Sequence, residues 1–483
     1  MALNSFRFLV ILPAIVLLYI VVVSLCKEKP YTSIVSSAFL TAISYAFFLS
    51  EQPSGAMFLF IVTLLTYVFA RCIEYNSERS MPTRTLLITA FALLALTPLI
   101  VFKYSAFIAT CFNHLVAVCG IHNYSVVDSQ GVSFVVPLGI SFFTFQAVGY
   151  LWDVYRGRIS AEHNFLYYML FVGFFPQIAS GPISTASELL PQIKKGHNVE
   201  WTDITEGVKL MLMGFFMKAV VADRIATFVN PVYADYENFS GTTCFIASVF
   251  YSLQIYGDFA GYSLIAIGVG HLFGFDLINN FRRPYLSYSV TEFWKRWHIS
   301  LTRWLKKHVY IPLGGNRKGK ANTYRNIMLT FLVSGLWHGA NFTFIIWGAI
   351  HGLVLCLERL FHLGDTPRSR LTAFIRIAVT FFIVNFAWIF FRMPTLGDAV
   401  NVIRRILTFA QGASLTLPKI SLLLLLFATV ALVVIEIMGE YYPHIKFLHH
   451  KNIFIRIVSV VSLAFMILTI GVLDSSQFIY VNF

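Results

Sequence analysis

The amino-acid sequence predicts an all-α integral membrane protein, a polytopic bundle of about eleven transmembrane helices with additional re-entrant and in-plane helices. Composition is the first reason: 57% of the 483 residues are hydrophobic and 12% are charged, whereas soluble proteins average about half apolar and about a quarter charged residues. The second reason is that apolar runs recur from one end of the chain to the other, and the longer ones can cross about 30 Å of hydrocarbon.

These apolar runs define the expected helices in order. They are Phe8–Leu25, Ile34–Leu49, Met57–Ala70, Leu86–Val101, Val132–Leu151, Phe165–Ile178, Val208–Ala222, Thr243–Tyr256, Ile327–Leu336, Phe342–Leu357, Leu371–Phe391, Ile420–Ile437 and Ile455–Leu473. Several are too short to cross a bilayer, so we expect fewer spans than runs. The first run lacks a small-residue cleavage site and precedes a charged flank, which favours a retained helix over a signal peptide.

Loop charges predict the orientation of the chain. Loops with several Lys or Arg alternate with loops that carry none, and the positive loops are expected in the cytoplasm. Both termini, including the tail 474–483, are then extracytoplasmic. The net charge of +13 is explained by loop bases beside anionic membrane lipids, so no nucleic-acid partner is expected. Because no long linker or repeat divides the chain, residues 1–483 are expected to form a single domain.

The segment Arg282–Arg325 is unusually basic for this chain. Aromatic and aliphatic residues recur there at helical spacing between the bases, which predicts an amphipathic helix in the cytoplasmic interface. A Gly-Gly-Asn-Arg turn at 314–317 follows this predicted helix within the same segment. Such a turn can contact phosphate, although it can also be an ordinary turn. The segment is therefore either a surface anchor or a binding site for an anionic donor. The candidate donor-binding residues are Arg296, Arg303, Lys306, Asn316 and Arg317.

Three histidines stand inside the most apolar part of this region. His298 follows Phe-Trp-Lys-Arg-Trp, His338 lies in Ser-Gly-Leu-Trp-His-Gly, and His351 follows in Trp-Gly-Ala-Ile-His-Gly. We expect a turn at 339–341 that places His338 deep in the membrane and His351 on the next helix. Such imidazoles can line a polar path or act as general bases. Alternatively, each is a buried histidine bonded to a backbone carbonyl. No metal site is expected, because metal-ligand spacing is absent.

Four blocks of the sequence resemble a known family. They are Pro137–Gln146, Phe175–Pro182, Tyr256–Tyr262 and the whole of Phe293–Gly352. Together they closely resemble the signature region, residues 137–352 here, of the membrane-bound O-acyltransferases, in particular the bacterial branch that O-acetylates polysaccharides such as alginate and peptidoglycan. The chain departs from that pattern at Leu264, at Arg282 and Arg283, and at Lys306–His308, which leaves the identity of donor and partner open.

The resemblance implies a helical bundle around a central tunnel in a bacterial inner membrane. It implies that His338 is the catalytic histidine and His298 the second position near the reaction path, with His351, Asp258 and Trp337 as tunnel-lining or supporting residues. Acetyl-CoA or an acyl carrier is the implied donor, with no bound cofactor. The implied acceptor is an extracytoplasmic polysaccharide, reached through a partner acetyltransferase.

The chain ends in Phe-Ile-Tyr-Val-Asn-Phe, which resembles an ending common in this branch. Tyr480 in this ending is a candidate acyl relay, since a phenol can act as a nucleophile beside a base; it could equally be an aromatic interface anchor. Two other functions stay open on the sequence. One is a transporter or flippase whose histidines couple protons, which Asp258 in an apolar context favours, and the other is a lipid O-acyltransferase.

Overall fold

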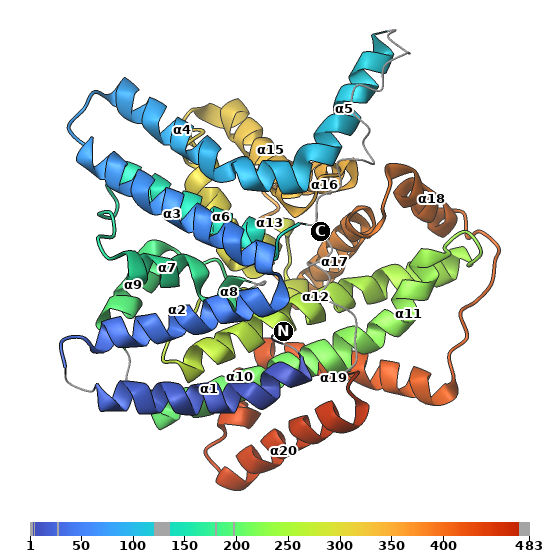
Figure 1. Ribbon diagram of the computed structural model, residues 1–483. Helices are drawn as coiled ribbons and strands as arrows, with labels where there is room; N and C mark the ends of the chain where they lie inside the picture. Colours follow the sequence, from blue (N-terminus) through green and yellow to red (C-terminus); the bar gives the residue numbers. More distant parts are fainter. Residues whose placement is uncertain are drawn as a thin grey trace. The chain divides into compact units, whose positions relative to one another are not determined.

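A computed structural model describes residues 3, 5–26, 29–119, 136–178, 181–196 and 199–472. Throughout these residues the regular structure is helical (Figure 1), and the isolated β-bridge in them joins Phe239 and Ala413. Eight helical stretches of the described chain are long and apolar enough to cross a membrane. The predicted class, a multi-pass all-α membrane protein, is confirmed.

The eight candidate spans are fewer than the eleven or so expected, and the reason lies in the other apolar runs. One of them is divided into two short helices, α7 (Phe165–Gly173) and α8 (Phe175–Ile178). Another lies in α12 (Gly241–Leu272), where Asp258 interrupts the hydrophobic sequence. A third lies in α15 (Gly319–His338), whose first turns carry Lys320 and Arg325. Charged groups lower the apolar character of both long helices.

Contacts divide the chain into two compact units, each described by itself. Unit 1 comprises Met1–Asp203 and Gly270–Leu277. Its helices, apart from α7 and α8, are α1 (Phe6–Leu25), α2 (Thr32–Glu51), α3 (Pro53–Tyr75), α4 (Met81–Leu99), the π-helix η1 (Ile100–Tyr104), α5 (Ser105–Val118), α6 (Ile140–Tyr155) and α9 (Ala186–Lys195). In it, α3 packs on α4 and α6, and α2 packs on α3 and α7.

Unit 2 comprises Ile204–Val269 and Ile278–Phe483. Its elements include most of α10 (Trp201–Phe215), most of α12, all of α15, and η2 (Phe216–Ala222), α11 (Asp223–Ala234), η3 (Pro284–Leu286), α13 (Val290–Arg296), α14 (Ile299–Leu305), η4 (Lys306–Tyr310), α16 (Phe342–Leu360), α17 (Arg370–Arg392), α18 (Leu396–Leu407), α19 (Lys419–Tyr441), η5 (Phe447–His449) and α20 (Ile453–Ile470). All three histidines singled out in the sequence belong to this unit.

Helices α15 and α16 form a close hairpin, with the turn where the sequence predicts it. Asn341 caps α16 by accepting a hydrogen bond from the Thr343 backbone N–H at 3.0 Å. Glycines allow the two backbones to touch: a Cβ on Gly335 would lie 2.2 Å from the Phe344 carbonyl oxygen, and one on Gly348 would lie 2.3 Å from that of Phe331. Small residues allow such backbone approach between membrane helices.

We expect Gly348→Ala to destabilise unit 2. The added methyl group would meet a backbone carbonyl at 2.3 Å, and overpacking of this kind costs about 1–3 kcal/mol. Thermal unfolding of the purified protein in detergent should show a lowered midpoint. Gly364→Ala is the matched control, because a Cβ at Gly364 meets nothing within 4 Å. Equal midpoints for the two variants would contradict this account of the hairpin.

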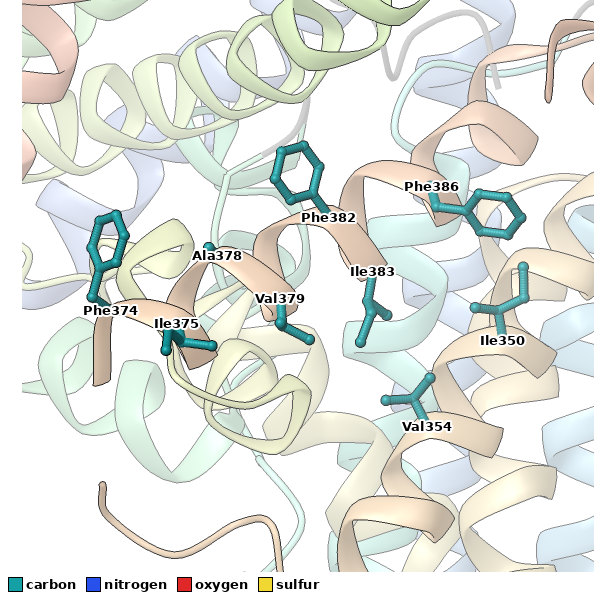
Figure 2. Close-up of a pocket in the computed structure, with 9 residues that line it drawn as sticks. All are labelled: Ile350, Val354, Phe374, Ile375, Ala378, Val379, Phe382, Ile383 and Phe386. Atoms are coloured by element: carbon teal, nitrogen blue, oxygen red, sulfur yellow. The ribbon is translucent and has the colours of Figure 1, made fainter. Parts of the chain in front are cut away.

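A wholly apolar groove of about 670 Å³ lies between α16 and α17 (Figure 2). It is lined by Ile350, Val354, Phe374, Ile375, Ala378, Val379, Phe382, Ile383 and Phe386. Both helices are candidate membrane spans, and the lining suits hydrocarbon. With no polar side chain among the lining residues, this groove offers no group for acid–base chemistry.

Candidate active site

His338 is the last residue of α15, at the closed end of the hairpin. The chain leaves the helix at Gly339, and the imidazole is 2% exposed. Aromatic rings surround it: the ring centroids of Trp337, Trp347 and Phe391 lie 4.8, 4.9 and 5.2 Å from its own. The side chain is therefore held in a dry, largely apolar environment, where electrostatic interactions are strong.

His298 lies at a break between α13 and α14. Its backbone has φ 44°, in the left-handed region that non-glycine residues adopt rarely. Asn280 holds this break from another segment, since its carbonyl oxygen accepts from the Ile299 N–H at 2.9 Å and its side-chain oxygen from the Ser300 N–H at 3.1 Å. The amphipathic helix predicted here is consequently two short helices, a tertiary effect that helical periodicity does not reveal.

The His298 imidazole is fully buried, and neither ring nitrogen has a hydrogen-bond partner among the described residues. Its ring meets Phe259 edge-on at 4.7 Å and Trp337 at 5.8 Å between centroids. Burial lowers the pKa of His298 to about 3, so the imidazole is neutral at physiological pH. A neutral, unsatisfied imidazole in a buried site is available to a ligand.

His351 lies in α16, one helical turn after Trp347, and is fully buried. The indole N–H of Trp294 donates to His351 Nδ1 at 3.3 Å. The Trp347 ring joins it to the rest of the cluster, with its centroid 5.0 Å from His351 and 4.9 Å from His338. The structure thus brings all three predicted histidines and Trp337 into one buried aromatic cluster.

Asp258 lies in α12 next to Phe259, the residue that contacts His298. It forms a buried ion pair with Lys218 of η2 at 2.6 Å, and Lys218 also pairs with Asp223 at 2.8 Å. The helices approach closely here, since a Cβ on Gly214 would lie 2.6 Å from the Gly261 carbonyl oxygen. Lys218 was not among the residues predicted from the sequence; the visible signal was a lysine inside an apolar run, which needs a counter-charge.

The candidate donor-binding residues are in two different situations. Arg296 is ion-paired with Glu292 at 2.5 Å and with Glu440 at 2.9 Å, so its charge is already balanced. The remaining four are exposed at the end of α14, at the start of η4 and in the loop before α15: Arg303, Lys306, Asn316 and Arg317. These four side chains are accessible to a ligand.

The loop before α15 has a defined shape. Gly314 and Gly315 have φ 109° and 56°, conformations that favour glycine. The Asn326 side chain, buried in α15, donates to the carbonyl oxygens of Leu313 and Gly315 at 3.2 and 2.9 Å. Asn316 and Arg317 therefore lie in a turn whose backbone is fixed by the Asn326 side chain.

The walls of the histidine cluster are built by aromatic residues that were not predicted as part of the site: Trp294, Trp347, Trp388 and Phe391. No group of three or more His, Cys, Asp or Glu suited to a metal ion occurs in the part of the chain that the structure describes. Tyr480, the candidate relay residue, lies outside the described residues. The site is thus defined by its imidazoles and indoles.

Comparison with known proteins gives a consistent result. The model of the MBOAT, membrane-bound O-acyltransferase family, matches residues 156–396. A probable alginate O-acetylase of Pseudomonas putida is 41% identical over 270 residues, which is 56% of this chain and 55% of the relative. A peptidoglycan O-acetyltransferase of Helicobacter pylori is 38% identical, covering 54% of this chain and 55% of the relative. A teichoic acid D-alanyltransferase of Bacillus subtilis is 28% identical, covering 51% and 66%. The chain spans about half the length of the O-acetylating relatives it matches.

Proposed function

The chain belongs to the membrane-bound O-acyltransferase family through residues 156–396, and on this premise we propose that it transfers acetyl groups toward hydroxyls of an extracytoplasmic polysaccharide. The observation that carries the proposal is the burial of His338. Its imidazole lies at the end of α15 and is enclosed by the rings of Trp337, Trp347 and Phe391. The names of the relatives support the acyl group and the class of acceptor, since one is a probable alginate O-acetylase and another a peptidoglycan O-acetyltransferase.

His338 is the proposed general base. A hydroxyl of the acceptor attacks the carbonyl carbon of an acyl thioester, and the imidazole accepts the hydroxyl proton as the new C–O bond forms. The proton then passes to the departing sulfur as the C–S bond breaks. His298, linked to His338 through Trp337, supports the same reaction from the second position. Aromatic walls exclude water, which would otherwise hydrolyse the thioester.

The donor is proposed to be acetyl-CoA or an acyl carrier approaching from the cytoplasm. Arg303, Lys306 and Arg317 are exposed and suited to phosphate groups, with Asn316 beside them in the loop. Arg296 contributes through its two ion pairs: the pair with Glu440 ties α13 to α19, and the pair with Glu292 lies within α13. This assignment places the basic segment on the cytoplasmic side of a bacterial inner membrane and both termini outside, where a partner acetyltransferase would take the acyl group.

Proton-coupled transport is the less supported function. Asp258 was the feature that favoured it, because an isolated carboxylate in an apolar helix often relays protons. In the structure Asp258 pairs with Lys218 at 2.6 Å, an arrangement that a stabilising ion cluster explains without any transported proton. Asp258 therefore gives no support to proton transport, and acyl transfer is the function that the histidine cluster favours.

The test is reconstitution of the protein in proteoliposomes with radiolabelled acetyl-CoA. Envelope polysaccharide from a strain lacking the protein serves as acceptor, together with the secreted fraction of the same strain as a source of partner. We expect protein-dependent label in the polysaccharide that mild base releases as acetate. Label that appears equally with empty liposomes, or no label with acetyl-CoA or an acetylated carrier, would refute the proposed function.

We expect Tyr480→Phe to abolish transfer to the polysaccharide if Tyr480 relays the acyl group, because the phenol oxygen is the only heavy atom removed. The measurement is acetate released from envelope polysaccharide, with mass spectrometry of the C-terminal peptide from wild-type cells to detect an acetylated tyrosine. Phe478→Leu is the control for a loss of aromatic anchoring. Full polysaccharide acetylation in Tyr480→Phe would refute the relay.

A further inference from the structure

Besides the two ring nitrogens of His298, two further buried nitrogens of the histidine cluster have no hydrogen-bond partner among the described residues. The indole nitrogen of Trp347 and Nε2 of His351 are each inaccessible to solvent and make no hydrogen bond with any described residue. Both side chains are fully buried. Buried polar groups are rarely left unpaired in native proteins, because they lose their bonds to water without replacement. Such groups indicate a place for a ligand atom that the protein itself does not supply.

Trp294 determines which nitrogen of His351 carries the proton. An indole N–H can only donate, so His351 Nδ1, which receives it at 3.3 Å, must be the acceptor. In a neutral imidazole the proton then lies on Nε2. His351 is therefore presented as an N–H donor, which distinguishes it from a general base.

The two donors belong to adjacent side chains beside the proposed catalytic histidine. Trp347 and His351 lie one turn apart on α16 and share a face of the helix. Their ring centroids are 5.0 Å apart, and the centroid of Trp347 is 4.9 Å from that of His338. The further ring neighbours of Trp347 are the aromatic side chains of Trp294, Trp388 and Phe391.

We propose that Trp347 Nε1–H and His351 Nε2–H bind the carbonyl oxygen of the acyl group and stabilise the negative charge that forms on it. This inference rests on the proposed acyl transfer. When the acceptor hydroxyl bonds to the carbonyl carbon, the π electron pair moves onto the carbonyl oxygen and the hydroxyl proton moves to the base. When the pair returns, the C–S bond breaks and the thiol leaves with that proton. Donors fixed in a dry site stabilise the oxyanion without reorganisation.

Three variants test the pair. Trp347→Phe removes one N–H and keeps an aromatic ring. His351→Asn keeps an amide oxygen near the position of Nδ1, where Trp294 can still donate, but places no donor at Nε2. His351→Gln places an amide N–H near Nε2 and should restore part of the activity. We expect kcat for acetyl transfer to fall about 10²–10³-fold in each of the first two, as for other oxyanion donors, with KM for acetyl-CoA changed much less.

Trp152→Phe is the matched control. Trp152 lies in α6 of unit 1, which holds none of the residues of the histidine cluster, and its buried indole nitrogen likewise has no hydrogen-bond partner among the described residues. Loss of this N–H should leave kcat within about threefold of wild type. A fall in kcat as large as that of Trp347→Phe would show that loss of an indole N–H outside the site has the same effect, and it would overturn the proposal.

A second readout does not depend on turnover. In the His338→Ala background, isotope-edited infrared spectra of bound [1-13C]acetyl-CoA should show a carbonyl band at lower frequency than in solution. Trp347→Phe or His351→Asn added to that background should move the band back. An unshifted band, or kcat within about threefold of wild type in both donor variants, would refute the donor pair while leaving acetyl transfer by the wild-type protein intact. Absence of transfer by the wild type would instead refute the proposed function.

Discussion

His338→Ala should lower acetyl transfer by about 10²–10⁴-fold, the range that a positioned general base contributes. The imidazole is 2% exposed at the end of α15 and enclosed by three aromatic rings, so solvent cannot readily replace it as a base. The reconstituted assay with radiolabelled acetyl-CoA measures the loss directly. His338→Gln, which preserves volume and hydrogen bonding without a basic nitrogen, should be as inactive as the alanine variant.

A control separates this loss from damage to the fold. His163→Ala removes an imidazole that is 69% exposed in its side chain and should leave transfer unchanged. Both His338 variants should elute as folded protein in detergent and retain binding of acetyl-CoA. Transfer that continues at more than about a third of the wild-type rate in folded His338→Gln would mean that another group is the base, with His298 the next candidate.

Lys218→Met should strongly destabilise unit 2. Its ammonium group, 3% exposed, is shared by Asp223 and Asp258, which are 4% and 2% exposed. Removing one partner of a buried ion pair typically costs about 3–5 kcal/mol, because charge remains buried without compensation. Thermal unfolding followed by size-exclusion chromatography in detergent should show a large drop in the midpoint.

The substitution has a matched control and a rescue. Lys209→Met breaks a pair with Glu206 in which the carboxylate side chain is 39% exposed, and such pairs contribute about 0–1 kcal/mol. Adding Asp223→Asn and Asp258→Asn to Lys218→Met removes the uncompensated charge and should recover much of the midpoint. If Lys218→Met and Lys209→Met unfold at the same temperature, the buried cluster does not stabilise the protein as we infer.

Local sequence was enough to predict the parts of this fold that depend on local physics. The α15–α16 hairpin follows from two apolar runs separated by Gly-Ala-Asn, and the family resemblance ranked His338 above the other histidines. By contrast, the left-handed break at His298 is held by Asn280, eighteen residues away. Helical periodicity cannot report such a contact, which is why one amphipathic helix was expected where two short ones occur.

The pairing of Lys218 with Asp258 is likewise a tertiary contact, although each charge is visible inside an apolar run of the sequence. Lys218 and Asp258 meet across forty residues because Gly214 and Gly261 allow two helices to approach. In the sequence Asp258 is an isolated acid whose partner cannot be assigned. Trp294 illustrates the same limit, since its hydrogen bond to His351 connects segments that are 57 positions apart. Contacts at these separations are tertiary outcomes, decided by packing rather than by propensity.

The aromatic cluster also gives the protein an intrinsic ultraviolet circular-dichroism signal. Five of the eight tryptophans in the chain lie in this cluster: Trp294, Trp337, Trp347, Trp388 and Trp297, whose ring centroid is 5.1 Å from that of Trp388. Trp347 and Trp388 are stacked, with centroids 5.6 Å apart and ring planes 24° apart, an arrangement in which two indole transitions couple and give paired circular-dichroism bands of opposite sign. A ligand that changes the distance or the angle between these two rings should therefore change the ultraviolet circular-dichroism spectrum of the unlabelled protein.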